Sequence, residues 1–158
     1  MAMIEIVDRF LSKEEFDSVL RYCYESSYFC GEVDYEGAIP TGMIRNILDS
    51  EFLYEMLVKK TQKLVPDLGL NRIYVNCFAP SENPYFHIDG KDGVTFLYYA
   101  NPVWELDEGG ETQFFIDSEI RGVTPIPNRL VYFDSNIPHR ATTFRTRHRF
   151  TIALKYGL

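Results

Sequence analysis

The sequence predicts an α+β domain that is mainly β, with short strands forming a sandwich or barrel that N-terminal helices cover. Apolar residues recur at helical spacing in the first 66 residues, and from residue 71 the period changes to two. Aromatic residues make up 15% of the chain, which suits a sheet because they fit a pleated, half-buried surface. We expect a single domain over residues 1–158, with a helical layer over about 1–66 and a β-core over about 71–156.

Two helices are expected in the N-terminal part. Ser12 and Glu15 form a capping-box pattern that predicts the start of the first helix. The second helix is expected to begin at Asp49 or Ser50. The glycine-containing segment 30–49 between them has two interpretations: a loop or hairpin at the mouth of the β-core that touches substrate, or a surface connection between the helices.

Alternating patterns bounded by glycine and proline predict the strands of the β-core. The expected strands cover residues 71–79, 94–100, 112–116, 129–133, 141–144 and 149–156.

Charge and composition exclude several classes of protein. The net charge of −7 argues against nucleic acid as a partner, because phosphate binding needs a basic face. The basic cluster at 140–149 is expected to be a solvated strand end, with nucleic acid or an acidic partner as the less favoured interpretation. Three irregularly spaced cysteines match neither a disulfide framework nor a zinc motif. No apolar run approaches the ~20 residues of a membrane span, and Glu5, Asp8 and Arg9 do not fit a signal peptide. We therefore expect a cytoplasmic protein that binds no membrane.

His87, Asp89 and His139 form the candidate metal site. His87 and Asp89 are two positions apart, so in an extended segment their side chains point to the same side. His139 must come from a distant strand folded alongside, as happens in a jelly roll or double-stranded β-helix. Two imidazoles and one carboxylate are the ligand set of non-haem Fe(II) oxygenases. The alternative for each histidine is a hydrogen-bonded structural imidazole.

The last predicted strand supplies a candidate anion site. Alternation places Arg149, Thr151 and Ala153 on one face and large apolar residues on the other. A planar cation among small side chains suits a pocket for a small anion, because guanidinium pairs with carboxylates through two hydrogen bonds. Arg147, two positions earlier, would lie on the same face and is the alternative to Arg149 as the anion-binding residue.

A longer set of motifs resembles the Fe(II)/2-oxoglutarate-dependent dioxygenases over about residues 71–156. Within them the sequence is most similar to the prolyl hydroxylases, both the collagen-type prolyl 4-hydroxylases and the oxygen-sensing prolyl hydroxylase domains. The residues that carry the resemblance are His87-Ile88-Asp89, Val94-Thr95-Phe96-Leu97-Tyr98-Tyr99-Ala100-Asn101, Trp104, Gly109-Gly110-Glu111-Thr112, Pro138-His139 and Arg149.

The resemblance implies roles for the site residues. His87, Asp89 and His139 would bind Fe(II), and Arg149 would pair with the distal carboxylate of 2-oxoglutarate.

It also implies that Tyr99, Thr95 and Thr112 line the 2-oxoglutarate pocket, with ordinary strand packing as the alternative for each. Candidate substrate contacts are Tyr35, Arg45 and Trp104.

The expected function is Fe(II)- and 2-oxoglutarate-dependent hydroxylation of prolyl residues in a peptide or protein, with succinate and CO₂ as co-products. The expected cofactors are Fe(II), 2-oxoglutarate and O₂, with ascorbate as a further candidate, and the expected state is a monomer or homodimer. Alternatives are a hydroxylase of a free amino acid or other small molecule, a cupin-like metal-binding protein without 2-oxoglutarate chemistry, and a purely structural β-sandwich. The negative net charge disfavours a nucleic-acid demethylase.

Overall fold

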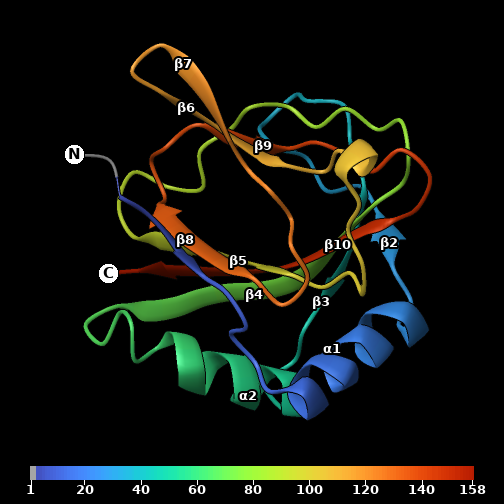
Figure 1. Ribbon diagram of the computed structural model, residues 1–158. Coiled ribbons are helices and arrows are strands. Elements are labelled where there is room, and N and C mark those ends of the chain that lie inside the picture. Colours follow the sequence, from blue (N-terminus) through green and yellow to red (C-terminus); the bar gives the residue numbers. More distant parts are fainter. Residues whose placement is uncertain (1–2) are drawn as a thin grey trace.

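The computed structural model describes residues 3–158 and consists of two antiparallel sheets with two helices below the larger one (Figure 1). The larger sheet has seven strands in the order β1-β8-β5-β10-β4-β3-β2, and the smaller has three in the order β7-β6-β9. This arrangement confirms the predicted class: mainly β, with a jelly-roll core and N-terminal supporting helices. The elements are β1 (Ile4–Val7), α1 (Lys13–Glu25), β2 (Phe29–Cys30), β3 (Met43–Asn46), α2 (Phe52–Thr61), β4 (Gly69–Phe78), β5 (Val94–Tyr99), a 3-10 turn (Leu106–Glu108), β6 (Thr112–Ile116), β7 (Glu119–Val123), β8 (Leu130–Asp134), β9 (His139–Ala141) and β10 (Arg149–Gly157).

The first helix begins where the sequence predicts. The Ser12 hydroxyl accepts a hydrogen bond from the Glu15 N–H, and the Glu15 carboxylate accepts one from the Ser12 N–H, at 3.2 and 2.8 Å. The second helix begins after Glu51, later than the predicted Asp49 or Ser50. Residues 48–51 form a turn in which the Glu51 N–H donates to the Leu48 carbonyl at 3.0 Å, and this turn delays the helix.

The N-terminal part contributes strands as well as helices, which its helical patterning did not predict. β1 pairs with β8 at one edge of the large sheet, and β3 pairs with β4 and with β2, the strand at the other edge. Segment 30–49 contains Cys30 of β2 and all of β3, which pair with each other, so the hairpin interpretation of this segment describes its backbone.

Two strands of the small sheet also differ from expectation. β7 was not predicted because most of its residues are exposed and lack an apolar alternation. The strand expected at 141–144 is wrong: β9 covers His139–Ala141 instead. Pairing with β6 ends at Ala141, and the chain then turns so that Phe144 forms a bridge with Gly109.

Strand β10 separates the two layers of the core. It lies between β5 and β4 at the centre of the large sheet. Its Phe150, Ile152 and Leu154 side chains belong to the core between the sheet and the helices. Ala153 belongs to the second core cluster, between the two sheets. The predicted division of this strand into an apolar face and a face with Arg149 is therefore confirmed.

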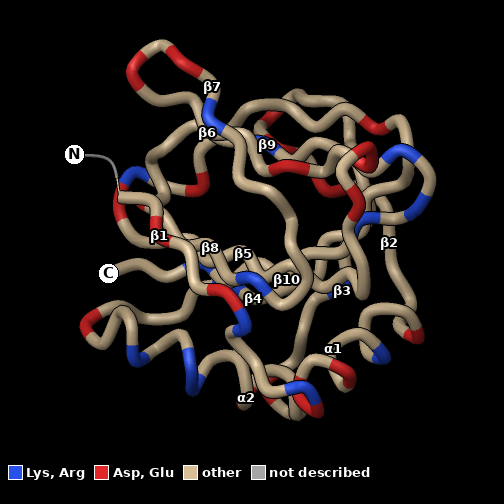
Figure 2. Tube along the Cα trace, viewed as in Figure 1, with Lys and Arg blue, Asp and Glu red and all other residues tan. Residues whose placement is uncertain are grey.

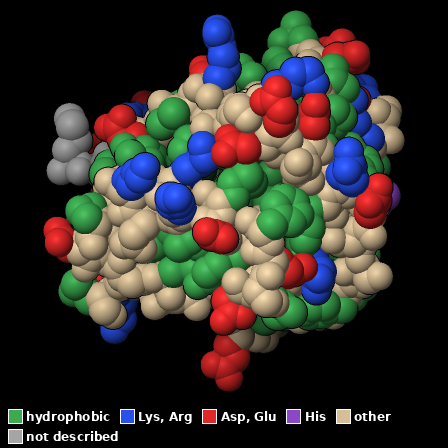
Figure 3. All heavy atoms as spheres, turned by 90° about the horizontal axis from the view of Figure 1, so that it is seen from below, with side chains coloured by type: hydrophobic (Ala, Val, Ile, Leu, Met, Phe, Trp, Pro, Cys, Tyr) green, Lys and Arg blue, Asp and Glu red, His purple; other side chains and the backbone are tan. Residues whose placement is uncertain are grey.

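Charged residues of both signs are interspersed along the chain (Figure 2). Their side chains are also mixed on the face of the molecule seen in Figure 3. The basic cluster at 140–149 is divided among separate partners, since Arg147 pairs with Glu108 at 3.1 Å and Arg149 is buried. Neither helix within residues 3–158 has the length and apolar character needed to cross a bilayer.

Candidate metal centre and co-substrate cavity

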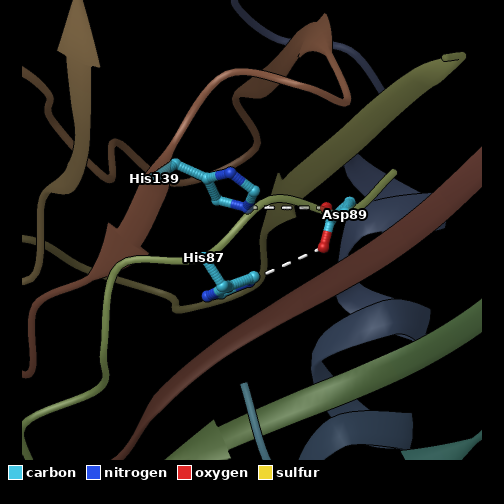
Figure 4. Close-up of side chains that lie close together, drawn as sticks. All are labelled: His87, Asp89 and His139. Carbon is cyan, nitrogen blue, oxygen red and sulfur yellow. Dashed lines mark ion pairs between the residues drawn. The ribbon is translucent and has the colours of Figure 1, made fainter. Parts of the chain in front are cut away.

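Backbone pairing brings the two candidate histidines together. The His87 N–H donates to the His139 carbonyl at 3.0 Å, and the His139 N–H donates back at 2.9 Å. The Asp89 N–H donates to the Ser135 carbonyl at 2.9 Å, which places Asp89 beside the same turn. As Figure 4 shows, both imidazoles point toward the Asp89 carboxylate, with Nε2···O distances of 3.6 Å from His87 and 3.4 Å from His139. One donor atom from each residue lies within 4.8 Å of the others.

Hydrogen bonds on the far side of each ring orient the imidazoles. His139 Nδ1 lies 2.9 Å from the Ile137 carbonyl oxygen, and His87 Nδ1 lies 3.1 Å from the Tyr85 carbonyl oxygen. The Asp34 carboxylate lies 3.4 Å from the same His87 nitrogen. A proton on Nδ1 that is donated to a carbonyl leaves the Nε2 lone pair free, which is how protein ligands to metals are usually held.

Asp89 is a buried carboxylate whose two oxygens have separate partners. The Thr95 hydroxyl donates to Oδ2 at 2.7 Å, and the Lys155 ammonium lies 2.8 Å from Oδ1. Burial raises the pKa of Asp89, but its interactions with the His139 and His87 imidazoles outweigh burial and leave the pKa far below its usual value. Burial lowers the pKa of His87, but the neighbouring Asp89 carboxylate outweighs burial and raises it.

The donor set fits Fe(II). Two imidazoles and one carboxylate form the facial arrangement of non-haem iron sites, which leaves positions open for other ligands. Structural zinc sites favour cysteine ligands. None of the three cysteines belongs to this group of candidate ligands.

One cavity of about 120 Å³ is lined by the triad of candidate metal ligands, His87, Asp89 and His139, and by Arg149. This volume is well below the roughly 300–1,000 Å³ of pockets for drug-sized ligands, so the cavity suits a small molecule. Other wall residues come from β4, β6 and β10, including Phe78, Thr112 and Thr151.

Arg149 is a buried cation, with only 1% of its surface exposed. Its Nε donates to the Gly110 carbonyl at 2.8 Å, and Nη2 donates to the Thr112 hydroxyl at 3.0 Å. Within residues 3–158, no carboxylate lies within the 4.0 Å of an ion pair with it. Burial lowers the pKa of this guanidinium from its usual value. A charge that has lost water without gaining a counter-ion is costly, so the geometry favours an anionic ligand in the cavity.

The other predicted pocket residues differ in their placement. Thr112 lines the cavity. Tyr99 and Thr95 are not part of its lining: the Tyr99 hydroxyl donates to the Thr112 hydroxyl at 2.7 Å, and Thr95 bonds to Asp89. Tyr99 and Thr95 therefore hold residues that line the cavity but do not line it themselves.

The three candidate substrate contacts lie outside the cavity lining. Tyr35 is half exposed, follows the lining residue Asp34, and packs its ring 5.6 Å from that of Tyr85.

Arg45 and Trp104 have structural partners. The Arg45 guanidinium pairs with Glu51 at 2.9 Å near the start of α2. The Trp104 indole N–H donates to the Gly109 carbonyl at 2.9 Å.

Sequence reasoning missed several cavity residues, among them the charged Lys155 and Asp34. Lys155 lines the cavity and has the same parity as Arg149 on β10, so the alternation of that strand could have revealed it. Asp34 also lines the cavity but lies in a loop with no periodic pattern, so the sequence carries no comparable signal for it.

Fold and site together define a non-haem iron oxygenase. The family model of the 2OG-Fe(II) oxygenase superfamily matches residues 75–156, more than half of the chain, so this chain belongs to that superfamily. It is a dioxygenase that uses Fe(II), 2-oxoglutarate and O₂. This membership argues against the cupin-like and purely structural alternatives.

Solved structures agree with this fold. A prolyl hydroxylase from Trichoplax adhaerens, in complex with a peptide fragment of the oxygen degradation domain of hypoxia inducible factor, has a TM-score of 0.81 at 24% identity, covering 97% of this chain and 82% of that one. A Pseudomonas putida prolyl-4-hydroxylase has a TM-score of 0.82 at 20% identity, covering 100% and 94%. HygX from Streptomyces hygroscopicus, with nickel, 2-oxoglutarate and hygromycin B bound, has a TM-score of 0.77 at 12% identity, covering 99% and 83%. A search of curated proteins gave no significant match.

Proposed function

We propose that this dioxygenase hydroxylates prolyl residues in a peptide or protein, with succinate and CO₂ as co-products. In this proposal His87, Asp89 and His139 hold Fe(II), and Arg149 pairs with the distal carboxylate of 2-oxoglutarate. The observation that carries the proposed site is the buried Arg149, which lies in one cavity with the triad and has no carboxylate partner in the described chain.

The neighbours of Arg149 support its role as an anion anchor. The Gly110 carbonyl holds Nε, while the hydroxyls of Thr112 and Thr151 lie 3.0 and 3.4 Å from the two terminal nitrogens. Tyr99 donates to the Thr112 hydroxyl, which leaves the Thr112 proton free to reach a carboxylate or another acceptor. A carboxylate bound here would gain charge-assisted hydrogen bonds in a dry pocket, which fixes its orientation as well as adding affinity.

Fe(II) and 2-oxoglutarate, when bound, supply the oxidising chemistry by activating O₂. The protein supplies placement. The Nδ1 contacts of the histidines hold both Nε2 atoms toward Asp89, and Arg149 fixes the far end of the co-substrate. The Asp89 and His139 side chains are only 3% and 5% exposed, which limits the access of water to the reacting centre.

The prolyl substrate is supported by the likeness of the fold to prolyl hydroxylases and by the mouth of the cavity. The small cavity suits the co-substrate and one small group, so most of a peptide would lie outside it. Two half-exposed apolar residues, Val33 and Ile88, line the cavity, and Tyr35 lies two residues beyond Val33. Such a rim suits an apolar pyrrolidine ring and its neighbouring backbone.

A hydroxylase of free amino acids or other small molecules is the second candidate. Asp34 lines the cavity, and its carboxylate suits a polar molecule with hydrogen-bond donors. The likeness to HygX, a structure with hygromycin B bound, favours the same reading.

The test is incubation of the purified protein with Fe(II), 2-oxoglutarate and O₂ against proline-containing peptides and free amino acids. We expect succinate to form, and mass spectrometry to find one added oxygen atom on a prolyl residue of a peptide. Hydroxylation of free amino acids alone would replace the leading proposal with the second candidate. If no compound gives a hydroxylated product or succinate, both proposals are contradicted.

A further inference from the structure

Lys155 is a second cation in the cavity, and its surroundings differ from those of Arg149. It lies on the same face of β10, but its ammonium has a carboxylate partner, Asp89 Oδ1, at 2.8 Å. Asp89 is the only carboxylate of the described chain within 4.0 Å of this ammonium. The Asp89 side chain is only 3% exposed, so water screens this pair weakly.

Asp89 is held from two neighbouring strands. Thr95 on β5 and Lys155 on β10 are direct cross-strand partners, and each contacts a different oxygen of the same carboxylate. Thr95 supplies a neutral hydroxyl at 2.7 Å from Oδ2, and Ser135 supports that hydroxyl at 3.1 Å. The two contacts therefore fix the orientation of Asp89 equally well but differ in charge.

That difference in charge has opposite consequences for a divalent ion. A hydroxyl orients the carboxylate and leaves its negative charge available, as supporting residues of metal ligands generally do. The Lys155 ammonium, 2.8 Å from Oδ1, partly neutralises the negative charge of Asp89. It also repels any cation bound to the Asp89 carboxylate. Because Coulomb energy scales with the product of the charges, the repulsion is larger for a divalent ion than for a monovalent one.

We propose that Lys155 competes with the metal ion for Asp89 and lowers the metal affinity of the site, whereas Thr95 positions the same carboxylate for the ion. Half-occupancy of the site then requires a higher free metal concentration than the ligand set alone would need. This inference rests on the proposed metal site but is independent of the substrate.

The test measures the binding of Mn²⁺ to the metal-free protein without substrate. The two readouts are calorimetry and the electron paramagnetic resonance signal of free Mn²⁺. Lys155→Met should tighten Mn²⁺ binding by about tenfold or more, because it removes a cation beside the ligand. Thr95→Val should weaken binding by about tenfold, the usual effect of losing a supporting contact. Lys155→Arg keeps the charge and should stay within about threefold of the wild type.

Lys63→Met is the matched control, because it removes the same charge from an exposed position outside the cavity and should leave Mn²⁺ binding unchanged. If Lys155→Met does not fold, as judged by circular dichroism, Lys155→Gln tests the same loss of charge with a polar side chain. Unchanged or weaker Mn²⁺ binding in the folded neutral variant would overturn the inference. If the wild type and Asp89→Ala bind Mn²⁺ equally poorly, the proposed metal site itself fails, and the inference with it.

Discussion

At the scale of single residues, the informative feature is which buried charges have partners. Glu108 and Arg147 pair near the surface at 3.1 Å, as structural charges usually do. Arg149 is more deeply buried and is bonded only to a carbonyl and to hydroxyls in the described chain. A fold gains little stability from such a residue, so its burial is better explained by binding an anion.

Replacing Arg149 with glutamine should weaken 2-oxoglutarate binding at least about 30-fold, since losing one partner of a buried charge pair costs roughly 2 kcal/mol or more. The measurement is the dissociation constant of 2-oxoglutarate with Mn²⁺ present. Arg147→Gln is the control, because Arg147 pairs with Glu108 and does not line the cavity. If Arg147→Gln has the larger effect, the anchor is Arg147 and the assignment of Arg149 is wrong.

The metal ligands can be tested against the third histidine of the chain. Asp89→Ala and His87→Ala should abolish the conversion of 2-oxoglutarate to succinate while circular dichroism shows a retained fold. His148→Ala should keep activity, because His148 is exposed and is no part of the triad. Full activity in the Asp89 variant would remove it from the ligand set.

At the scale of elements, the start of β6 connects the small sheet to the anion site. Gly110 precedes this strand with φ +84°, a conformation that L residues rarely adopt, and its carbonyl accepts the hydrogen bond from Arg149. A side chain at Gly110 would also overlap the Phe144 ring. The Gly109-Gly110 pair is thus required by the backbone path that places an acceptor at the guanidinium.

Gly110→Ala should lower the free energy of unfolding by at least about 1–3 kcal/mol, the cost of this backbone conformation for a residue other than glycine. It should also weaken 2-oxoglutarate binding, because the acceptor of Arg149 moves. Chemical denaturation and a 2-oxoglutarate titration measure the two effects. Gly122→Ala is the control, since a side chain there meets only ordinary contacts with Glu111. Equal stability of the two variants would contradict this account.

Prediction from sequence succeeded for elements in which periodicity and burial agree. β10 alternates between two cores, so its two faces could be predicted from the pattern, with Arg147 left as an alternative to Arg149. The positions of His87 and Asp89 were likewise indicated by a spacing of two. β1 and β7 carry no such pattern, because they lie at sheet edges and most of their residues are exposed or half-exposed.

At the scale of the whole molecule, acidic side chains contribute to stability through hydrogen bonds to both local and distant partners. A hydrogen bond from Arg129 lowers the pKa of Asp8 from its usual 3.8 and ties β1 to the start of β8. Bonds from the Ser12 backbone and from Thr146 lower the pKa values of Glu15 and Glu108 from their usual 4.5. Each contribution is present above the unfolded pKa and is lost as the pH falls through the lower folded pKa.

The melting temperature should therefore fall as the pH is lowered from about 5.5 to below about 4.5, because these carboxylates become protonated. Differential scanning calorimetry across this range measures the effect. Glu108→Gln should have a smaller decrease than the wild type, because one of the three contributions is already absent. A melting temperature that rises on acidification would reverse the sign expected from these pKa values.

Contacts between distant segments also explain which parts of the site the sequence did not reveal. The resemblance to a known family identified the triad and Arg149 by matching motifs, but the pairing of Thr95 with Lys155 depends on sheet order. Sheet order follows from how the whole chain packs and is not encoded in any local period. The role of Thr95 was consequently expected at the co-substrate, whereas its hydroxyl contacts Asp89.

The central place of β10 also determines the order in which the fold can be completed. It is the latest of the described strands in the sequence, yet it joins the β1-β8-β5 half of the large sheet to the β4-β3-β2 half. During synthesis, β5 and β4 keep unpaired edges until β10 has been made. Unpaired strand edges favour aggregation. Because β10 also carries Arg149 and Lys155, the nascent chain acquires its cationic cavity residues only at the step that closes the sheet.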